Sequence, residues 1–151
     1  MLGLRHSHQP ERVLLTDFFV AEREEAASIA SGKSRNADYS TKNADNSVLA
    51  ALWGALDETA DYSRLAGDDF LIETGSVEGP WVFDLPTELI ICLSDLPEAE
   101  FSQIADRWAS SKELSYYGAS GADMIPSLVT VKQLAEKAHS SKCRLMLRMA
   151  M

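Results

Sequence analysis

The chain has 151 residues, of which 46% are hydrophobic and 25% charged, and its 14 Lys and Arg stand against 23 Asp and Glu for a net charge of −9. This composition excludes a disordered, a collagen-like or a disulfide-dense protein, and the length fits one domain that needs no metal or disulfide to fold. An anionic surface repels phosphate groups, so we expect neither a nucleic-acid nor a membrane partner.

The first third of the chain predicts a strand that runs directly into a helix. Residues 1–12 are polar and predict a flexible arm. VLLTDFFV at 13–20 is rich in β-branched and aromatic residues and is typical of a strand. Three glutamates then favour the start of a helix, which should end at Gly32. Residues 33–46 lack large aliphatic side chains and predict a mobile polar loop within a single domain, 13–151.

A second helix is predicted in VLAALWGALD, where apolar residues recur at i, i+1, i+4, i+5 and i+8. It should cover 47–57, with Asn46 or Ser47 as its N-cap. A short further turn of helix is expected near 61–66.

FLIETG and PWVFDLP flank a glycine-containing turn, which is typical of a β-hairpin. Alternation along the second strand should place Trp81 and Phe83 on one face and Val82 and Asp84 on the other.

Two helices are expected in the following stretch. Residues 87–94 fit a buried strand as well as a short helix, and Pro86 and Thr87 favour the helix. The next helix begins at Pro97. Its apolar stripe consists of Phe101, Ile104, Ala105 and Trp108.

The C-terminal part predicts a loop, a helix and a strand. Residues 115–127 contain many Gly, Ser and Ala and predict the loop, while Thr130 and Gln133 form a capping box that should begin the helix. Apolar residues alternate in 144–151, which predicts a half-buried edge strand. Together the elements predict an α+β domain with a small antiparallel or mixed sheet packed against about four to five helices.

No complete catalytic or cofactor-binding motif occurs. The glycine patterns that bind phosphate are absent, so we expect no cofactor. His6 and His8 lie in the arm and His139 at a helix end, without partners at zinc-binding spacing, so we expect no metal site. Carboxylate pairs are frequent and leave open a small hydrolase or transferase that uses Asp or Glu side chains.

The two cysteines and the apolar runs bear on localisation. Cys92 and Cys143 both lie in apolar stretches, and two buried free thiols fit a reducing compartment, with a single disulfide as the alternative. The N-terminal residues lack the apolar core of a secretory signal, and no stretch approaches the roughly 20 apolar residues of a membrane span. We therefore expect a cytoplasmic protein.

Acidic residues are concentrated between 57 and 106, where thirteen carboxylates accompany one basic residue, Arg64. Such a surface either serves solubility or docks a basic partner. Aromatic side chains concentrate at protein interfaces, so a tryptophan and two adjacent tyrosines support the second interpretation. The candidate binding residues are Asp68, Asp69, Glu73, Glu78, Trp81, Tyr116 and Tyr117.

These observations favour a non-enzymatic interaction or inhibitory module that binds a basic protein. Two alternatives stay open: the carboxylate-dependent hydrolase or transferase, and a homodimeric structural protein in which the 144–151 strand pairs with a second copy.

Overall fold

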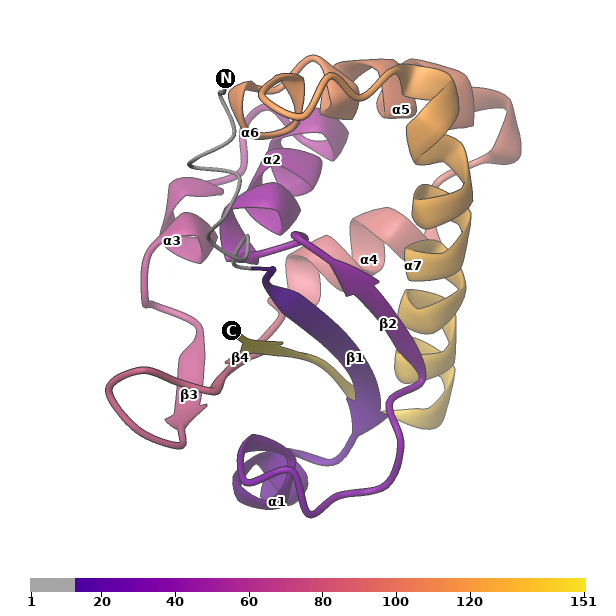
Figure 1. Cartoon of the computed structure of the whole chain (residues 1–151). Coiled ribbons are helices and arrows are strands. Elements are labelled where there is room, and N and C mark those ends of the chain that lie inside the picture. Colours follow the sequence, from indigo (N-terminus) through magenta and orange to yellow (C-terminus); the bar gives the residue numbers. More distant parts are fainter. Residues whose placement is uncertain (1–12) are drawn as a thin grey trace, which may run out of the picture.

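The computed structural model describes residues 13–151 and contains one five-stranded antiparallel sheet in the order β2-β1-β5-β4-β3 (Figure 1). The strands are β1 (Leu15–Ala21), β2 (Tyr39–Lys42), β3 (Leu71–Thr74), β4 (Trp81–Asp84) and β5 (Arg144–Ala150). The predicted α+β class is confirmed, and the pairing is antiparallel throughout these strands. The arm predicted at 1–12 lies outside the described residues.

Seven α-helices and two short 3-10 helices occur in the described part of the chain, more than the four to five helices expected. The excess consists of short elements such as α3 and α6, each a single turn. The helices are η2 (Arg23–Glu25), α1 (Ala26–Ala30), α2 (Asn46–Leu56), α3 (Ser63–Ala66), α4 (Thr87–Ser94), η3 (Glu98–Glu100), α5 (Phe101–Ala109), α6 (Lys112–Ser115) and α7 (Gly121–Ser141).

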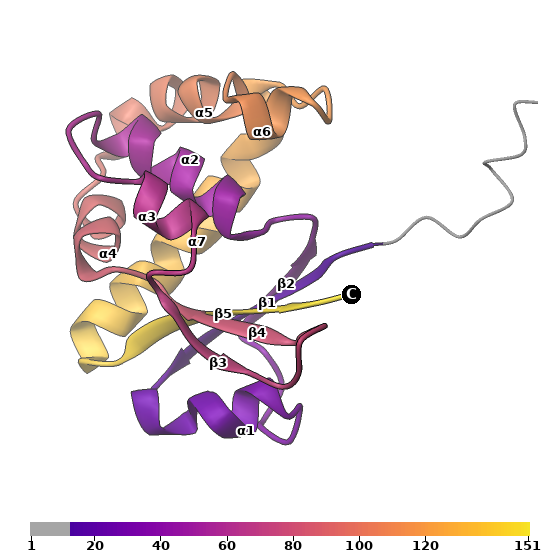
Figure 2. The same ribbon diagram turned by 90° about the vertical axis from the view of Figure 1, so that its left-hand side faces the viewer.

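The sheet separates two unequal layers (Figure 2). One face, here called the helical face, is covered by α2, α4, α5 and α7, whereas α1 alone packs on the other, the α1 face. Successive side chains of a strand point to opposite faces. Phe18 and Leu147, which are register partners, therefore lie in the large core, and their neighbours Phe19 and Met146 lie in the small cluster under α1.

Several predictions of single elements are confirmed. β3 and β4 form the expected hairpin, and Phe83 and Val82 belong to the cores on opposite faces. Residues 87–94 are helical, and α4 buries Leu89, Ile90 and Leu93. The stripe predicted after Pro97 lies on α5, which buries Ile104, Ala105 and Trp108.

The prediction of a continuous loop over 33–46 was wrong, because β2 lies within it and pairs with β1. Tyr39 and Thr41 are half-buried on the helical face, while Ser40 and Lys42 are exposed. A four-residue strand without an aliphatic side chain gives no apolar periodicity, which is why the sequence pattern did not reveal it.

The predicted cap of α2 was also wrong. The cap is Asp45, whose Oδ1 accepts a hydrogen bond from the Val48 N–H at 2.9 Å. Asn46, one of the two expected caps, instead donates its side-chain amide to the Leu65 and Ala66 carbonyls at the end of α3. The segment between β2 and α3 is therefore held by two neighbouring polar side chains with different roles.

The last helix begins nine residues before Thr130, so the predicted start was wrong. Ser120 is the N-cap and forms a capping box with Asp123, and Pro126 lies inside the helix. A Cβ at Gly121 would collide with the carboxylate of Asp106, so a glycine allows α7 to start against α5. The Thr130 hydroxyl donates to the Pro126 carbonyl at 3.0 Å and caps nothing.

The C-terminal strand was expected at an edge of the sheet, and it is the central strand. β5 pairs with β1 along Leu15–Ala21 and with β4 along Trp81–Asp84. The edge position was therefore wrong, because both hydrogen-bonding edges of β5 are filled within the sheet and leave no free edge for a second copy.

Candidate functional site

The seven candidate residues lie in separate parts of the structure. Asp68 and Asp69 precede β3, and Asp69 Oδ2 accepts a hydrogen bond from Arg64 Nε at 2.8 Å. The other hairpin candidates, Glu73, Glu78 and Trp81, lie on β3, in the turn and at the start of β4. Trp81 is half-buried against the large core.

The two tyrosines lie at another end of the molecule, beside α6. Their rings meet edge to face with centroids 5.2 Å apart, and both are exposed. Figures 1 and 2 place α6 at the top of the molecule and the β3–β4 hairpin well below it. The structure does not join Trp81 and the tyrosine pair into one patch.

Carboxylates gather on the outer side of α2, α3 and α4. Asp61, Asp69 and Glu88 all contribute favourable charge interactions to Arg64 and help to raise the pKa of its guanidinium, after the hydrogen bond from Arg64 to Asp69, which contributes most. We call this region the acidic face. Its carboxylates are Asp57, Asp61, Asp69, Glu88 and Asp95.

The acidic face also affects the thiol of Cys92 on α4. Burial raises the pKa of its thiol most, and the charges of Asp57, Asp95 and Glu88 raise it further. Three carboxylates from α4 and from the end of α2 therefore converge on one half-buried sulfur. A thiol with a raised pKa is a weak nucleophile, so this environment does not favour catalysis by Cys92.

Two large apolar side chains are exposed on the elements that form the acidic face. Ile91 on α4 is 42% exposed, and Tyr62, which packs beside Gly54 of α2, is 43% exposed. Glu88, Ile91 and Asp95 follow one another at i, i+3 and i+7, opposite the buried stripe of α4. This spacing could have identified the face from the sequence once 87–94 was taken as a helix.

The basic residues near the acidic face are engaged with the protein. Arg107 donates to the Ala55 carbonyl at 3.4 Å, and Lys132 donates to the Leu93 and Ser94 carbonyls at 3.2 and 2.8 Å. Cations at helix C-termini stabilise the free carbonyls there. These two side chains are therefore directed at backbone oxygens of α2 and α4 and leave the carboxylates in excess.

Charges on the α1 face are arranged in pairs across strands. Asp84 is 5% exposed, and its carboxylate meets Arg144 Nε at 2.8 Å and Arg23 Nη1 at 3.5 Å. Asp17 lies 3.7 Å from Arg148, whose buried Nε has no hydrogen-bond partner among residues 13–151. These pairs were not predictable from local patterns, because the strand order brings together residues more than fifty positions apart.

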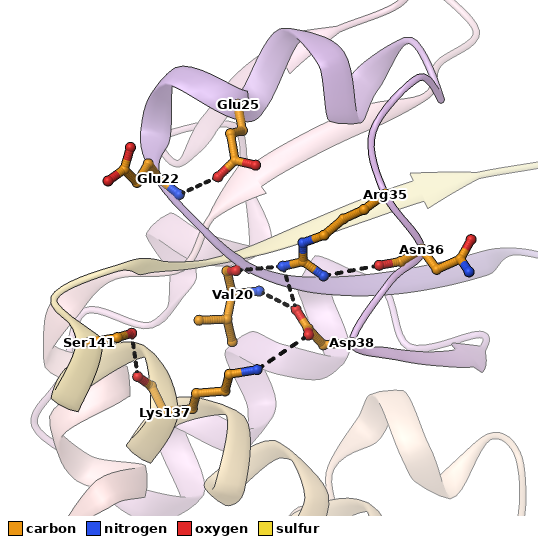
Figure 3. Close-up of polar contacts among 8 residues, drawn as sticks. All are labelled: Val20, Glu22, Glu25, Arg35, Asn36, Asp38, Lys137 and Ser141. Atoms are coloured by element: carbon orange, nitrogen blue, oxygen red, sulfur yellow. Dashed lines mark hydrogen bonds and ion pairs between the residues drawn. The ribbon is translucent and has the colours of Figure 1, made fainter.

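A second polar network fixes the chain before β2 (Figure 3). Asp38 accepts hydrogen bonds from the Val20 N–H at 2.7 Å and from Arg35 at 3.0 Å, and Lys137 Nζ of α7 lies 3.6 Å away. Burial alone would raise the pKa of Asp38, but these hydrogen bonds and charges outweigh it, so the pKa lies below its ordinary value. Arg35 also donates to the Val20 carbonyl, which closes the network on β1.

The alternative of a hydrolase or transferase that uses two carboxylates was checked against the positions and pKa values of the Asp and Glu side chains. An open hollow beside α6 is bordered by Asp45 and Glu113, but Asp45 already caps α2. General acids need a raised pKa, whereas hydrogen bonds lower the pKa of Asp57 and Asp123. Residues 13–151 contain no group of three or more His, Cys, Asp or Glu placed to hold a metal ion.

Within the described range, none of the helices is both long enough and apolar enough to cross a bilayer. Comparison with known proteins identifies no relative, since no family model, no curated protein and no solved structure matches the chain.

Proposed function

We propose that the protein is a non-enzymatic binding module that docks a basic protein segment on the acidic face of α2, α3 and α4. The observation that carries the proposal is the convergence of five carboxylates from separate segments around Arg64 and Cys92. A concentrated negative field attracts a basic partner and increases its association rate.

The exposed apolar side chains favour a docking surface over a charged surface that serves only solubility. Protein interfaces combine an apolar centre with a polar rim, and Ile91 and Tyr62 provide apolar area on elements that also carry the carboxylates. The partner that fits best is an amphipathic segment with alternating basic and apolar side chains. Its apolar residues would cover Ile91 and its Lys or Arg side chains would meet Glu88 and Asp95.

The test uses a fluorescent amphipathic peptide of Lys and Leu and measures its anisotropy with the full chain at low and high salt. We expect saturable binding that weakens as salt rises, because exposed charges are screened. Glu88→Lys should weaken binding roughly five- to tenfold, since one attractive pair becomes repulsive.

The matched control is Glu24→Lys on η2. Glu24 is exposed and lies in the first turn of a helical segment, as Glu88 does, and the two variants change the net charge equally. Equal losses in the two variants would mean that the peptide responds to net charge alone and would contradict the proposal. Absence of peptide binding at low salt would also contradict it.

A further inference from the structure

A polar pocket of about 400 Å³ lies on the α1 face, between strands β1 and β5, the end of α1 and the loop that leads to β2. Arg35 and Arg148 line it together with Asp17, Ser34 and Ser40. Its volume falls within the roughly 300–1,000 Å³ found for small-molecule sites. The sheet separates this pocket from the acidic face, which lies on helices of the opposite layer (Figure 2).

The Arg148 guanidinium lacks hydrogen-bond acceptors. Its Nε is buried and has no hydrogen-bond partner among residues 13–151. Asp17 Oδ2 lies 3.7 Å from Arg148 Nη1, which is beyond hydrogen-bonding distance. The other oxygen of Asp17 instead accepts a hydrogen bond from the Ser40 hydroxyl at 2.6 Å. Because buried polar groups are normally hydrogen-bonded, this guanidinium has donors to offer a further acceptor.

The end of the Arg148 side chain can be reached from the pocket. Nη1 is the atom nearest to Asp17, and a Cβ added at Gly32 would lie 3.6 Å from Nη2. Asp17 and Gly32 both line the pocket, and the Arg148 side chain is 19% exposed. The two Nη atoms therefore lie beside the pocket, whereas Nε is enclosed by the protein.

The ion pairs at this pocket leave positive charge in excess. Arg35 and Lys137 share one carboxylate, that of Asp38, at 3.0 and 3.6 Å (Figure 3). Arg148 lies beside Asp17. Three cationic side chains thus contact two carboxylates, which leaves one positive charge on a protein whose net charge is −9.

More distant charges do not remove this excess. Glu25 adds a negative charge near Arg35, but its carboxylate accepts a hydrogen bond from the Glu22 N–H. Lys42 lies on the same face of β2 as Ser40, and Lys33 is exposed in the adjoining loop. The pocket is therefore a local basic site.

We infer that this pocket binds a small organic acid through its carboxylate. A carboxylate is a planar monoanion, which matches the single excess positive charge and the paired Nη donors of Arg148. Further donors are the Ser34 hydroxyl and the backbone N–H groups of residues 34–37, which donate no hydrogen bond within the range 13–151. Phe19 and Ala37 add apolar lining for the rest of the molecule.

Benzoate and benzamide test the inference, because they have nearly the same shape and differ in charge. Heteronuclear NMR titration of the full chain measures both affinities and locates the site. Benzoate should bind at one site, shift the amide signals of residues 32–37, and bind at least roughly tenfold more tightly than benzamide. Sulfate, a tetrahedral dianion, should bind more weakly than benzoate.

A pair of arginine variants tests the role of the guanidinium. Arg148→Lys keeps the positive charge but removes the planar pair of donors, and it should weaken benzoate binding roughly five- to tenfold. Arg144→Lys is the matched control, because Arg144 lies on the same strand, bonds Asp84 and does not line this pocket. It should leave benzoate binding unchanged.

A second pair of variants tests the location without altering an ion pair. Ser34→Asp adds a carboxylate to the lining and should abolish benzoate binding, whereas Ser28→Asp makes the same change at an exposed position of α1 outside the pocket and should not. Thermal unfolding of each variant shows that it is folded. The inference is overturned if benzoate binds no better than benzamide, if sulfate binds more tightly than benzoate, if Arg144→Lys weakens binding as much as Arg148→Lys, or if Ser34→Asp binds normally.

Discussion

The two faces of the sheet differ in the charged residues that their strands carry. On the helical face, the buried strand residues are apolar apart from Thr16, and a layer of four helices covers them. On the α1 face, the same strands carry Asp17, Asp84 and Arg148, and a five-residue helix covers only part of the surface. Because the single short helix leaves part of this face uncovered, the strands can carry charged side chains there, provided that each pairs with an opposite charge.

The excess negative charge lies elsewhere, on the outside of the helical layer. Asp57, Glu88 and Asp95 point away from the large core, and nearby bases are directed at helix carbonyls. The carboxylates of the α1 face are therefore paired within the protein, whereas those of the acidic face are available to a partner. This contrast is the physical basis for placing the docking surface on α2, α3 and α4.

The largest expected effect comes from a matched pair on β1. Phe18→Ala removes a ring from the large core and should destabilise the protein by about 4 kcal/mol, since the void joins an apolar cavity that Phe18 lines together with Leu49 and Trp108. Phe19→Ala removes the same ring from the α1 face and should cost about 3 kcal/mol, the lower end of the range for such changes, because a short helix can move to fill the space. Urea denaturation measures both, and equal losses would show that the two faces are equally rigid.

The ion pairs offer a second comparison. Asp84→Ala removes a buried carboxylate that accepts a hydrogen bond from Arg144 and pairs with Arg23, and it should cost about 2 kcal/mol. Asp69→Ala removes the partner of Arg64, but the two side chains are 54% and 52% exposed, so the loss should stay below about 1 kcal/mol. A loss at Asp69 as large as that at Asp84 would contradict the division into structural and available charge.

Much of the fold was predictable from local sequence patterns, whereas the candidate site was predictable only in part. The stripe of α5 and the hairpin were predictable because their apolar spacing is set by the period of the element. The start of α7 was missed because Pro126 and Gly121 indicate a loop in isolation, and only the contact with Asp106 explains the glycine.

The features that could not be predicted depend on how the helices and strands pack in three dimensions. The cavity beside Trp108 depends on how α2, α6 and α7 pack against the edge of the sheet, and the apolar periodicity of single elements does not predict that packing. The pairing of Asp84 with Arg144 depends on β4 lying beside β5, which the sequence left open. The acidic composition of 57–106 was visible, but its convergence on Cys92 required the packing of α4 against α2.

A pH experiment separates the Asp38 network from the acidic face. The pKa of Asp38 is lowered in the folded state, so its contribution to stability is complete above its ordinary value of 3.8 and is lost as the pH falls below that value. Asp38→Asn should destabilise the protein by about 1–2 kcal/mol near neutral pH. The difference between the two proteins should shrink toward pH 3 and below, and a difference that stays constant over this range would contradict the role of the carboxylate.

The smallest effect, and the most direct measure of the acidic face, is the reactivity of Cys92. Its thiol pKa is raised first by burial and then by Asp57, Asp95 and Glu88, so alkylation by iodoacetamide at mildly alkaline pH should be slower than for a free thiol. In a Cys143→Ser background, Glu88→Gln with Asp95→Asn should speed the reaction because the thiolate loses two repulsive neighbours. Glu24→Gln removes a charge from the α1 side of the sheet and should leave the rate unchanged, and added salt should narrow the gap between the variants. If the rate does not respond to the two α4 carboxylates, burial alone governs Cys92, and the field that the docking proposal requires is too weak at the surface of α4.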